Sequence, residues 1–370
     1  MRTVLVAACI AALAGSAWIH HARQAHDPAG LAACTVGSGA TSRTCLADVT
    51  WKRMRERSTG VALRELEAVA RTDPRVSTAC HTAMHPVGQR AFKRDGSWSP
   101  VEAAQRVPGQ CANGFIHGYV GAAVERGGPT AIASAAAACT AMFPKHAPDQ
   151  SLQDCVHGLG HGARRTGSLD SALGACARID VRKRRFECFG GALMEDAAHA
   201  DGHGTDTTAA PCDAQVGDRA RACYLYLPTR RALAPRDVVR ICETAATADT
   251  RSICAFSAAA RIGAGADPVA RCGVFDAPTL AAACMRGYFS NEIVSYHRLS
   301  ERAAMRSCGT GPAAASCQRQ LGSALALAVG RLEATTACRA ATTDTAARRA
   351  CSAGAATSDV LNLLEPSKAT

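Results

Sequence analysis

The chain has 370 residues, 19 of them cysteine, and is several times longer than the small scaffolds that depend on disulfides for want of a core. Hydrophobic residues make up 48% and charged residues 20%, proportions that exclude wholesale disorder. The formal net charge is +11, but aromatic residues make up only 4% and no recognition motif accompanies the charge, so we expect no nucleic-acid partner. A core built mainly from Ala, Val and Leu favours packed helices over a sheet sandwich.

The N-terminus carries an uncharged segment, Thr3–Ile19, which follows Arg2 and contains the small residues Ala14 to Ala17. This pattern predicts a secretory signal peptide over residues 1–19. An uncleaved N-terminal anchor is the alternative, because about 17 apolar residues are at the short limit for a membrane span. Residues 20–58 then form a linker or N-terminal cap. We expect a secreted or periplasmic protein, or a membrane-anchored one that faces the same side and meets the membrane only through this segment.

The cysteines are predicted to form disulfides. Removal of the leader removes Cys9 and leaves 18 cysteines, and an even number in an exported chain indicates disulfides rather than thiolate metal ligands. Short pairs recur through the chain: Cys139/Cys155, Cys176/Cys188, Cys212/Cys223, Cys242/Cys254, Cys272/Cys284, Cys308/Cys317 and Cys338/Cys351. For the four cysteines outside this scheme we expect Cys34–Cys45 and Cys80–Cys111.

The second cysteines of the pairs, extended upstream to Cys80, recur at intervals of about 34 residues. We therefore predict an all-α, right-handed solenoid of about eight or nine disulfide-stapled helical hairpins. In each hairpin an A helix ends near the first cysteine and a B helix begins near the second. A small residue three positions after the second cysteine favours close helix packing, with Tyr226 as one exception. The plan is similar to that of Sel1-like cysteine-rich repeat proteins, although their Leu-Gly-x-x-Tyr motif is absent, so the likeness is one of architecture.

Local signals predict where several helices begin and end. Asp73-Pro74 can open the helix that carries Cys80. Residues 99–102 and 151–154 both fit a capping box that starts with Ser. Pro86 is expected to kink or end its helix. The Gly- and Asp-containing segment 199–206 is predicted to be a loop, which weakens His199 and His203 as ligands.

The histidines do not follow the cysteine period. Eight of the 12 lie between residues 81 and 203, which divides the array into His-rich repeats over 59–205 and His-poor repeats over 206–370. Three pairs have i,i+4 spacing, and in the two that fall in predicted helices, His81/His85 and His157/His161, this spacing places both imidazoles on one face of the helix. If successive B helices stack, five imidazoles converge, and we predict them as metal ligands: His81, His85, His117, His157 and His161.

Residues near the predicted site suggest its surroundings. Glu195 follows the position that corresponds to His161 in the next repeat and could extend the site. Asp154, Glu195 and Glu125 are weak candidates for a general base. The glycines between the ligands, such as Gly158, are costly in a helix and indicate a close backbone approach.

Imidazole ligands suit Zn, Cu or Fe, and the absent His-Glu-x-x-His motif disfavours a zinc protease of that type. The leading hypothesis is an exported metal-binding protein, a description that includes a metalloenzyme acting on an extracytoplasmic small molecule or peptide. The alternative is a non-catalytic scaffold whose groove binds a protein or polymer partner. A scaffold has no need to concentrate imidazoles in three neighbouring repeats, whereas a metal site does. Histidines that only pack in the core, or that line a cleft without metal, are the remaining interpretations.

Overall fold

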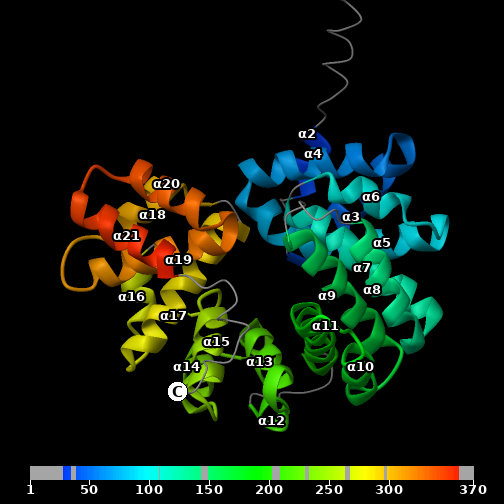
Figure 1. The fold of residues 1–370 in the computed structure, drawn as a ribbon. Helices are drawn as coiled ribbons and strands as arrows, with labels where there is room; N and C mark the ends of the chain where they lie inside the picture. The colour runs from blue at the N-terminus through cyan, green and yellow to red at the C-terminus, as the bar shows by residue number, and fades with distance from the viewer. Residues whose placement is uncertain are drawn as a thin grey trace, which may run out of the picture.

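The computed structural model describes residues 28–34, 39–107, 109–142, 149–201, 209–229, 233–262, 267–295 and 298–357. Within these ranges the chain is helical and contains no strand, which confirms the predicted all-α class (Figure 1). The predicted leader lies outside the described residues, so the signal peptide and the anchor stay predictions. Among the described helices, none combines the length and the apolar character that a bilayer span requires.

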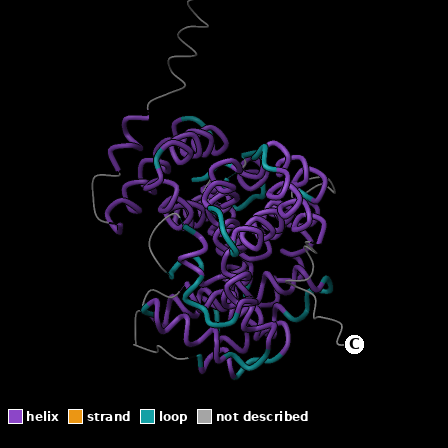
Figure 2. Tube along the Cα trace, turned by 90° about the vertical axis from the view of Figure 1, so that its left-hand side faces the viewer, coloured by secondary structure: helices purple, strands orange, loops and turns teal. Residues whose placement is uncertain are grey.

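The helices form pairs along the chain, joined by short connections (Figures 1 and 2). The A helices, first in each pair, are α2 (Pro28–Ala33), α4 (Thr59–Thr72), α6 (Ser99–Gln105), α8 (Ile132–Met142), α10 (Leu169–Cys176), α12 (Ala210–Asp213), α14 (Pro235–Thr244), α16 (Pro268–Cys272), α18 (Glu301–Ser307) and α20 (Arg331–Ala341). The B helices are α3 (Gly39–Glu56), α5 (Pro74–Asp95), α7 (Gln110–Gly127), α9 (Asp149–Arg165), α11 (Arg182–Asp201), α13 (Gly217–Tyr226), α15 (Ala248–Ala258), α17 (Pro278–Phe289), α19 (Ala314–Val329) and α21 (Thr345–Thr357). Short 3₁₀ turns at Pro129–Ala131 (η2) and Leu227–Thr229 (η3) and a π turn at Ser290–Ser295 (η4) complete the described elements.

Each B helix packs against the next one, so the B helices form a continuous row from α3 to α21. The row bends into an arc, and α20 and α21 come back to the level of the N-terminal helices (Figure 1). The pairing starts earlier than predicted, because α2 and α3 already form a hairpin. The core between the helices is made mainly of Ala, Val, Leu and Cys side chains, as the aromatic-poor composition requires.

Nine disulfides link neighbouring helices, and all nine predicted pairings are confirmed. Eight of them join an A helix to its own B helix: Cys34–Cys45, Cys139–Cys155, Cys176–Cys188, Cys212–Cys223, Cys242–Cys254, Cys272–Cys284, Cys308–Cys317 and Cys338–Cys351. The ninth, Cys80–Cys111, joins two successive B helices, α5 and α7. The A helices of those two pairs, α4 and α6, contain no cysteine, which leaves Cys80 and Cys111 to each other. This density of disulfides indicates an oxidising, extracellular environment.

The structure confirms one predicted helix boundary and corrects another. Asp73 caps α5 as predicted and accepts a hydrogen bond from the Arg75 backbone N–H (2.9 Å). Of the two outcomes expected for Pro86, a kink or an end of the helix, the end is wrong, because α5 continues to Asp95. Met84 and Val87, on either side of the proline, are fully buried, and this packing offsets the hydrogen bond that proline removes.

Two further local predictions are corrected by the structure. Neither capping box forms, because Trp98 occupies the N-cap position of α6 and α9 already begins at Asp149. The predicted loop over 199–206 is wrong for its first residues, since α11 extends to Asp201. Residues 202–206 lie outside the described part of the chain.

Candidate metal centre

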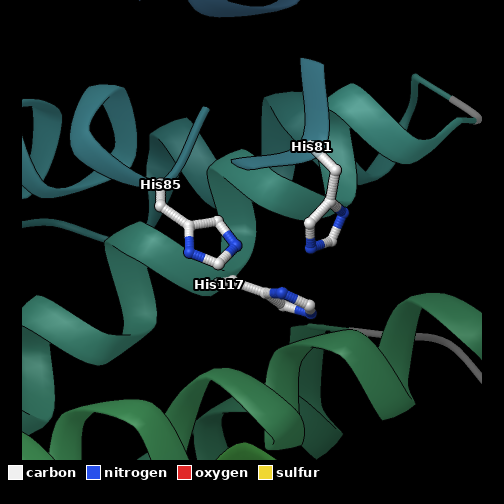
Figure 3. Close-up of side chains that lie close together, drawn as sticks. All are labelled: His81, His85 and His117. Carbon is white, nitrogen blue, oxygen red and sulfur yellow. The ribbon is translucent and has the colours of Figure 1, made fainter. Parts of the chain in front are cut away.

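The five predicted histidines lie together on three successive B helices. His81 and His85 come from α5, His117 from α7, and His157 and His161 from α9. The ring centroids of His81 and His117 are 4.8 Å apart, and those of His117 and His157 are 4.9 Å apart. The rings of His81, His85 and His117 turn toward a common space between the helices (Figure 3). The structure therefore brings together all five residues that the spacing singled out.

Glycines allow these helices to come so close. A Cβ atom on Gly114 would lie 2.0 Å from the carbonyl oxygen of His81, and one on Gly118 would lie 1.9 Å from that of His85. On the next interface, a Cβ atom on Gly158 would lie 3.0 Å from the Cα atom of His117. The backbone approach that the glycines indicated in the sequence is thus the approach of neighbouring B helices, which places histidines of different helices within reach of one ion.

The histidines form two triads that share His117. Ligand nitrogens of His81, His85 and His117 all lie within 4.8 Å of one another, and the same holds for His117, His157 and His161. His117, His157 and His161 are buried, with 3–4% of each residue exposed, while His81 and His85 are half-buried. Both triads are thus largely shielded from water, and the α5 side is the more open one.

Three of the imidazoles are held in place through their Nδ1 atoms. The Nδ1 atom of His81 donates to the backbone carbonyl oxygen of Gln110 (3.0 Å), and that of His161 donates to the Glu195 carboxylate (2.8 Å). The Nδ1 atom of His157 lies 3.2 Å from the Tyr226 hydroxyl. A partner on one ring nitrogen fixes the orientation of a metal-binding histidine and, where the partner is an acceptor, leaves the lone pair on the other nitrogen.

Several nitrogens that face the cluster have no hydrogen-bond partner. The Nε2 atoms of His85 and His161 and both ring nitrogens of His117 are buried without one. Leaving a buried polar atom unsatisfied costs about 1–3 kcal/mol each. Unsatisfied nitrogens gathered at one point indicate a ligand that accepts electron pairs, and a metal ion is such a ligand.

Burial keeps these imidazoles neutral. Removal from water lowers the pKa of His81, and it lowers the pKa of His85, His117 and His157 well below the ordinary value of 6.5. The neighbouring histidines add to the effect at His85, His117 and His157, because one protonated ring would repel another. At neutral pH these rings therefore offer lone pairs without competition from protons.

Carboxylates surround the cluster. The Asp154 Oδ1 atom lies 3.4 Å from the Nε2 atom of His117, and the Glu187 Oε2 atom lies 3.9 Å from the Nδ1 atom of His157. Burial raises the pKa of Glu195, but hydrogen bonds from His161 and Arg165 outweigh this effect and lower the pKa to about 2. Glu195 is thus ionised and bound to its partners. Negative charge at this distance favours a bound cation over an empty site.

The weak general-base candidates all lie at the cluster, but in supporting positions. Glu195 holds His161, Asp154 lies beside His117, and Glu125 pairs with Arg165 (2.5 Å). None of these contacts shows proton transfer, so their catalytic role stays a prediction.

Sequence reasoning missed three partners of the histidines: Tyr226, Glu187 and the carbonyl group of Gln110. Gln110 and Glu187 occupy equivalent positions in their repeats, and Asp154 occupies the same position in the repeat between them. Gln110, Asp154 and Glu187 each directly precede a B-helix cysteine, and each contacts a histidine of the preceding B helix. Tyr226 lies three positions after the second cysteine of its pair, where most repeats have a small residue, and this exception was its signal in the sequence. Its ring fits because the facing residue is Gly190, whose added Cβ atom would lie 2.4 Å from that ring.

Comparisons with protein-family models, with curated proteins and with solved structures find no match.

Proposed function

We propose that this protein is an exported metal-binding protein that holds a transition-metal ion in the histidine cluster of α5, α7 and α9. The observation that carries the proposal is the convergence of buried imidazole nitrogens without hydrogen-bond partners, at His85, His117 and His161. Histidines that serve only packing are satisfied by neighbouring groups, because the cost of leaving them bare is high.

The donor set selects the class of metal. All ligands are imidazoles, which suit Zn, Cu or Fe, whereas Ca²⁺ and Mg²⁺ prefer oxygen ligands. The described cysteines are all paired in disulfides and offer no thiolate. We therefore expect nitrogen-dominated coordination of a transition metal, with Zn, Cu and Fe as the candidates.

The triads are close enough to bind an ion after small side-chain rotations. Zn–N bonds of about 2.0–2.1 Å in tetrahedral geometry place the ligand nitrogens roughly 3.3 Å apart. The nitrogens of each triad lie within 4.8 Å of one another, so they need to close by at most about 1.5 Å. Three protein ligands leave a fourth position open, which is the arrangement of catalytic rather than structural zinc sites. An extracytoplasmic metalloenzyme acting on a small molecule or peptide is therefore the wider form of the proposal.

Metal analysis of the purified, disulfide-intact chain tests the proposal. After removal of metals with a chelator, the chain is reconstituted with Zn²⁺, Cu²⁺ or Fe²⁺, dialysed and subjected to elemental analysis. We expect stoichiometric metal in the wild type and a lower metal content in the His157→Ala/His161→Ala variant, which retains only the triad of His81, His85 and His117. The matched control is Thr78→Ala/Thr82→Ala, which has the same spacing on α5 and removes exposed hydroxyls bonded only to their own helix.

Thermal unfolding provides a second readout. An ion at 100 times its dissociation constant stabilises the folded chain by about 2.7 kcal/mol. This gain should be present in the wild type and the threonine control and smaller in the histidine variant, which retains one of the two triads. A wild-type chain that retains no stoichiometric metal with any of the three ions would refute the proposed function.

A further inference from the structure

His117 is the centre of the cluster. Its ring centroid lies 4.8 and 5.5 Å from those of His81 and His85 of α5, and 4.9 and 5.9 Å from those of His157 and His161 of α9, while those of His85 and His161 lie 5.4 Å apart. It is the member that the two triads share. The reason is its helix, since α7 lies between α5 and α9 and packs against both.

The two ring nitrogens of His117 differ from those of its neighbours. In His81, His157 and His161 the Nδ1 atom has a polar neighbour that orients the ring. In His117 both Nδ1 and Nε2 are buried and neither makes a hydrogen bond. A histidine that binds one ion normally gives its second nitrogen to an orienting partner. The ring has no hydrogen bond at either nitrogen, with only the Asp154 Oδ1 atom near Nε2 (3.4 Å), and it lies between two pairs of further ligands, so it can bind an ion at each nitrogen.

The charges around the cluster favour bound cations. Four carboxylates reach the histidines directly or through Arg165: Asp154, Glu187, Glu195 and Glu125. The Arg165 guanidinium, bonded to Glu195 (3.0 Å) and Glu125, offsets part of this negative charge. An imidazole that binds metal through both nitrogens loses its ring proton to solvent and adds a further negative charge, which a second cation would balance.

From these observations we propose that the cluster is a dinuclear centre in which His117 bridges two transition-metal ions, one bound with His81 and His85 and the other with His157 and His161. The inference rests on the proposed metal-binding function and specifies its stoichiometry. It also explains why the ligands come in i,i+4 pairs on α5 and α9, on either side of a single histidine on α7.

Metal stoichiometry separates this inference from the proposed function. Zn²⁺ binding to the chelator-treated full chain is measured by equilibrium dialysis in the wild type and in His85→Ala, His161→Ala and His117→Ala. We expect two ions per chain in the wild type and one in each of His85→Ala and His161→Ala, because each variant retains one intact triad. In His117→Ala both ions should be weakened, with circular dichroism and the thiol count confirming that the chain is folded. One ion per wild-type chain would overturn the bridge but leave the proposed function intact, and no ion at all would refute both.

Copper provides a second, spectroscopic test. Two Cu²⁺ ions joined through one imidazolate ring are magnetically coupled, so the electron paramagnetic resonance signal of the doubly loaded chain should integrate to far less than two copper ions. The matched reference is His117→Gln loaded with the same copper, whose signal should recover. Two fully visible copper ions in the wild type would show independent sites and overturn the bridging role of His117.

Discussion

The contact between α5 and α7 makes the substitution Gly118→Ala a direct test of how the site is built. Gly118 lies next to the central ligand His117, and a Cβ atom there would lie 1.9 Å from the carbonyl oxygen of His85. Real Cβ atoms essentially never approach another heavy atom closer than 3.0 Å, so the two helices would have to separate by at least about 1 Å. The atoms that the added Cβ would meet all belong to the His85 backbone, so no side-chain rotation can relieve the clash.

The expected free-energy change combines two opposing effects. Overpacking a close contact costs about 1–3 kcal/mol, and alanine in place of glycine returns up to about 1 kcal/mol of helix propensity. We therefore expect Gly118→Ala to lower the free energy of unfolding by about 1–2 kcal/mol. The same separation moves His85 away from His117, so metal affinity should also fall by about tenfold.

The control is Gly174→Ala. Gly174 lies within α10, and an added Cβ atom would meet nothing within 4 Å. This variant should gain about 0.5–1 kcal/mol and bind metal as the wild type does. Urea unfolding and metal titration of the three proteins give both quantities. If Gly118→Ala were as stable as Gly174→Ala, the helices would not be in backbone contact, and the account of the glycines would be wrong.

Three further predictions follow from individual contacts. Tyr226→Phe removes the hydroxyl beside His157 and should weaken metal binding by about tenfold. The control is Tyr224→Phe, because the Tyr224 hydroxyl donates to Asp213 away from the cluster, and it should leave the affinity unchanged. Equal affinities of the two variants in a metal titration would exclude an orienting role for Tyr226. Glu67 is buried on α4 and accepts a hydrogen bond from the backbone N–H of Ala112 (3.0 Å) at the start of α7, and burial raises its pKa to about 7. Its protonated form favours the folded state, so the stabilisation is fully present below about pH 4.5 and is lost as the pH rises through 7, about 3 kcal/mol in all. Unfolding curves from pH 4 to 8 should show this loss in the wild type relative to Glu67→Gln, and parallel curves would contradict the assignment. Replacing both cysteines of the 31-residue loop Cys80–Cys111 by Ala should lower the free energy of unfolding by about 4 kcal/mol, and the same change in the 12-residue loop Cys242–Cys254 should lower it by about 3 kcal/mol. The reverse order in urea unfolding would argue against loop entropy as the origin of the stabilisation.

The architecture was readable from the sequence because the cysteines report contacts between helices. A disulfide can form only where two Cα atoms come within about 7 Å, so a regular series of pairs carries tertiary information that propensities lack. The row of B helices then followed from the period, and the row put His117 between the two i,i+4 pairs. Helix boundaries were less predictable. Pro86 continues inside α5 because burial of Met84 and Val87 outweighs a local preference.

The surroundings of the ligands were harder to predict than the ligands themselves. The contact between Tyr226 and His157 skips a B helix, from α13 to α9, and depends on Gly190 of α11 leaving room for the ring. No spacing rule within one repeat contains that information. The Gln110 contact uses a backbone carbonyl group, which has no sequence signature beyond its position. By contrast, Glu195 was found because it directly follows the position that corresponds to His161 in the neighbouring repeat.

The one disulfide that departs from the hairpin pattern bears on how the site is assembled. The disulfide holds the Cα atoms of Cys80 in α5 and Cys111 in α7 5.0 Å apart. The residues next to these cysteines, His81 and Gln110, are hydrogen-bonded to each other. The glycines that allow this packing lower the stability of the helices, and buried nitrogens without partners add a further cost, so an additional constraint on the helices of the first triad is favourable. A covalent link between the two B helices supplies it without any metal. We therefore expect the first triad to be formed by oxidative folding of the chain, and the ion to bind a site whose ligands are already in place.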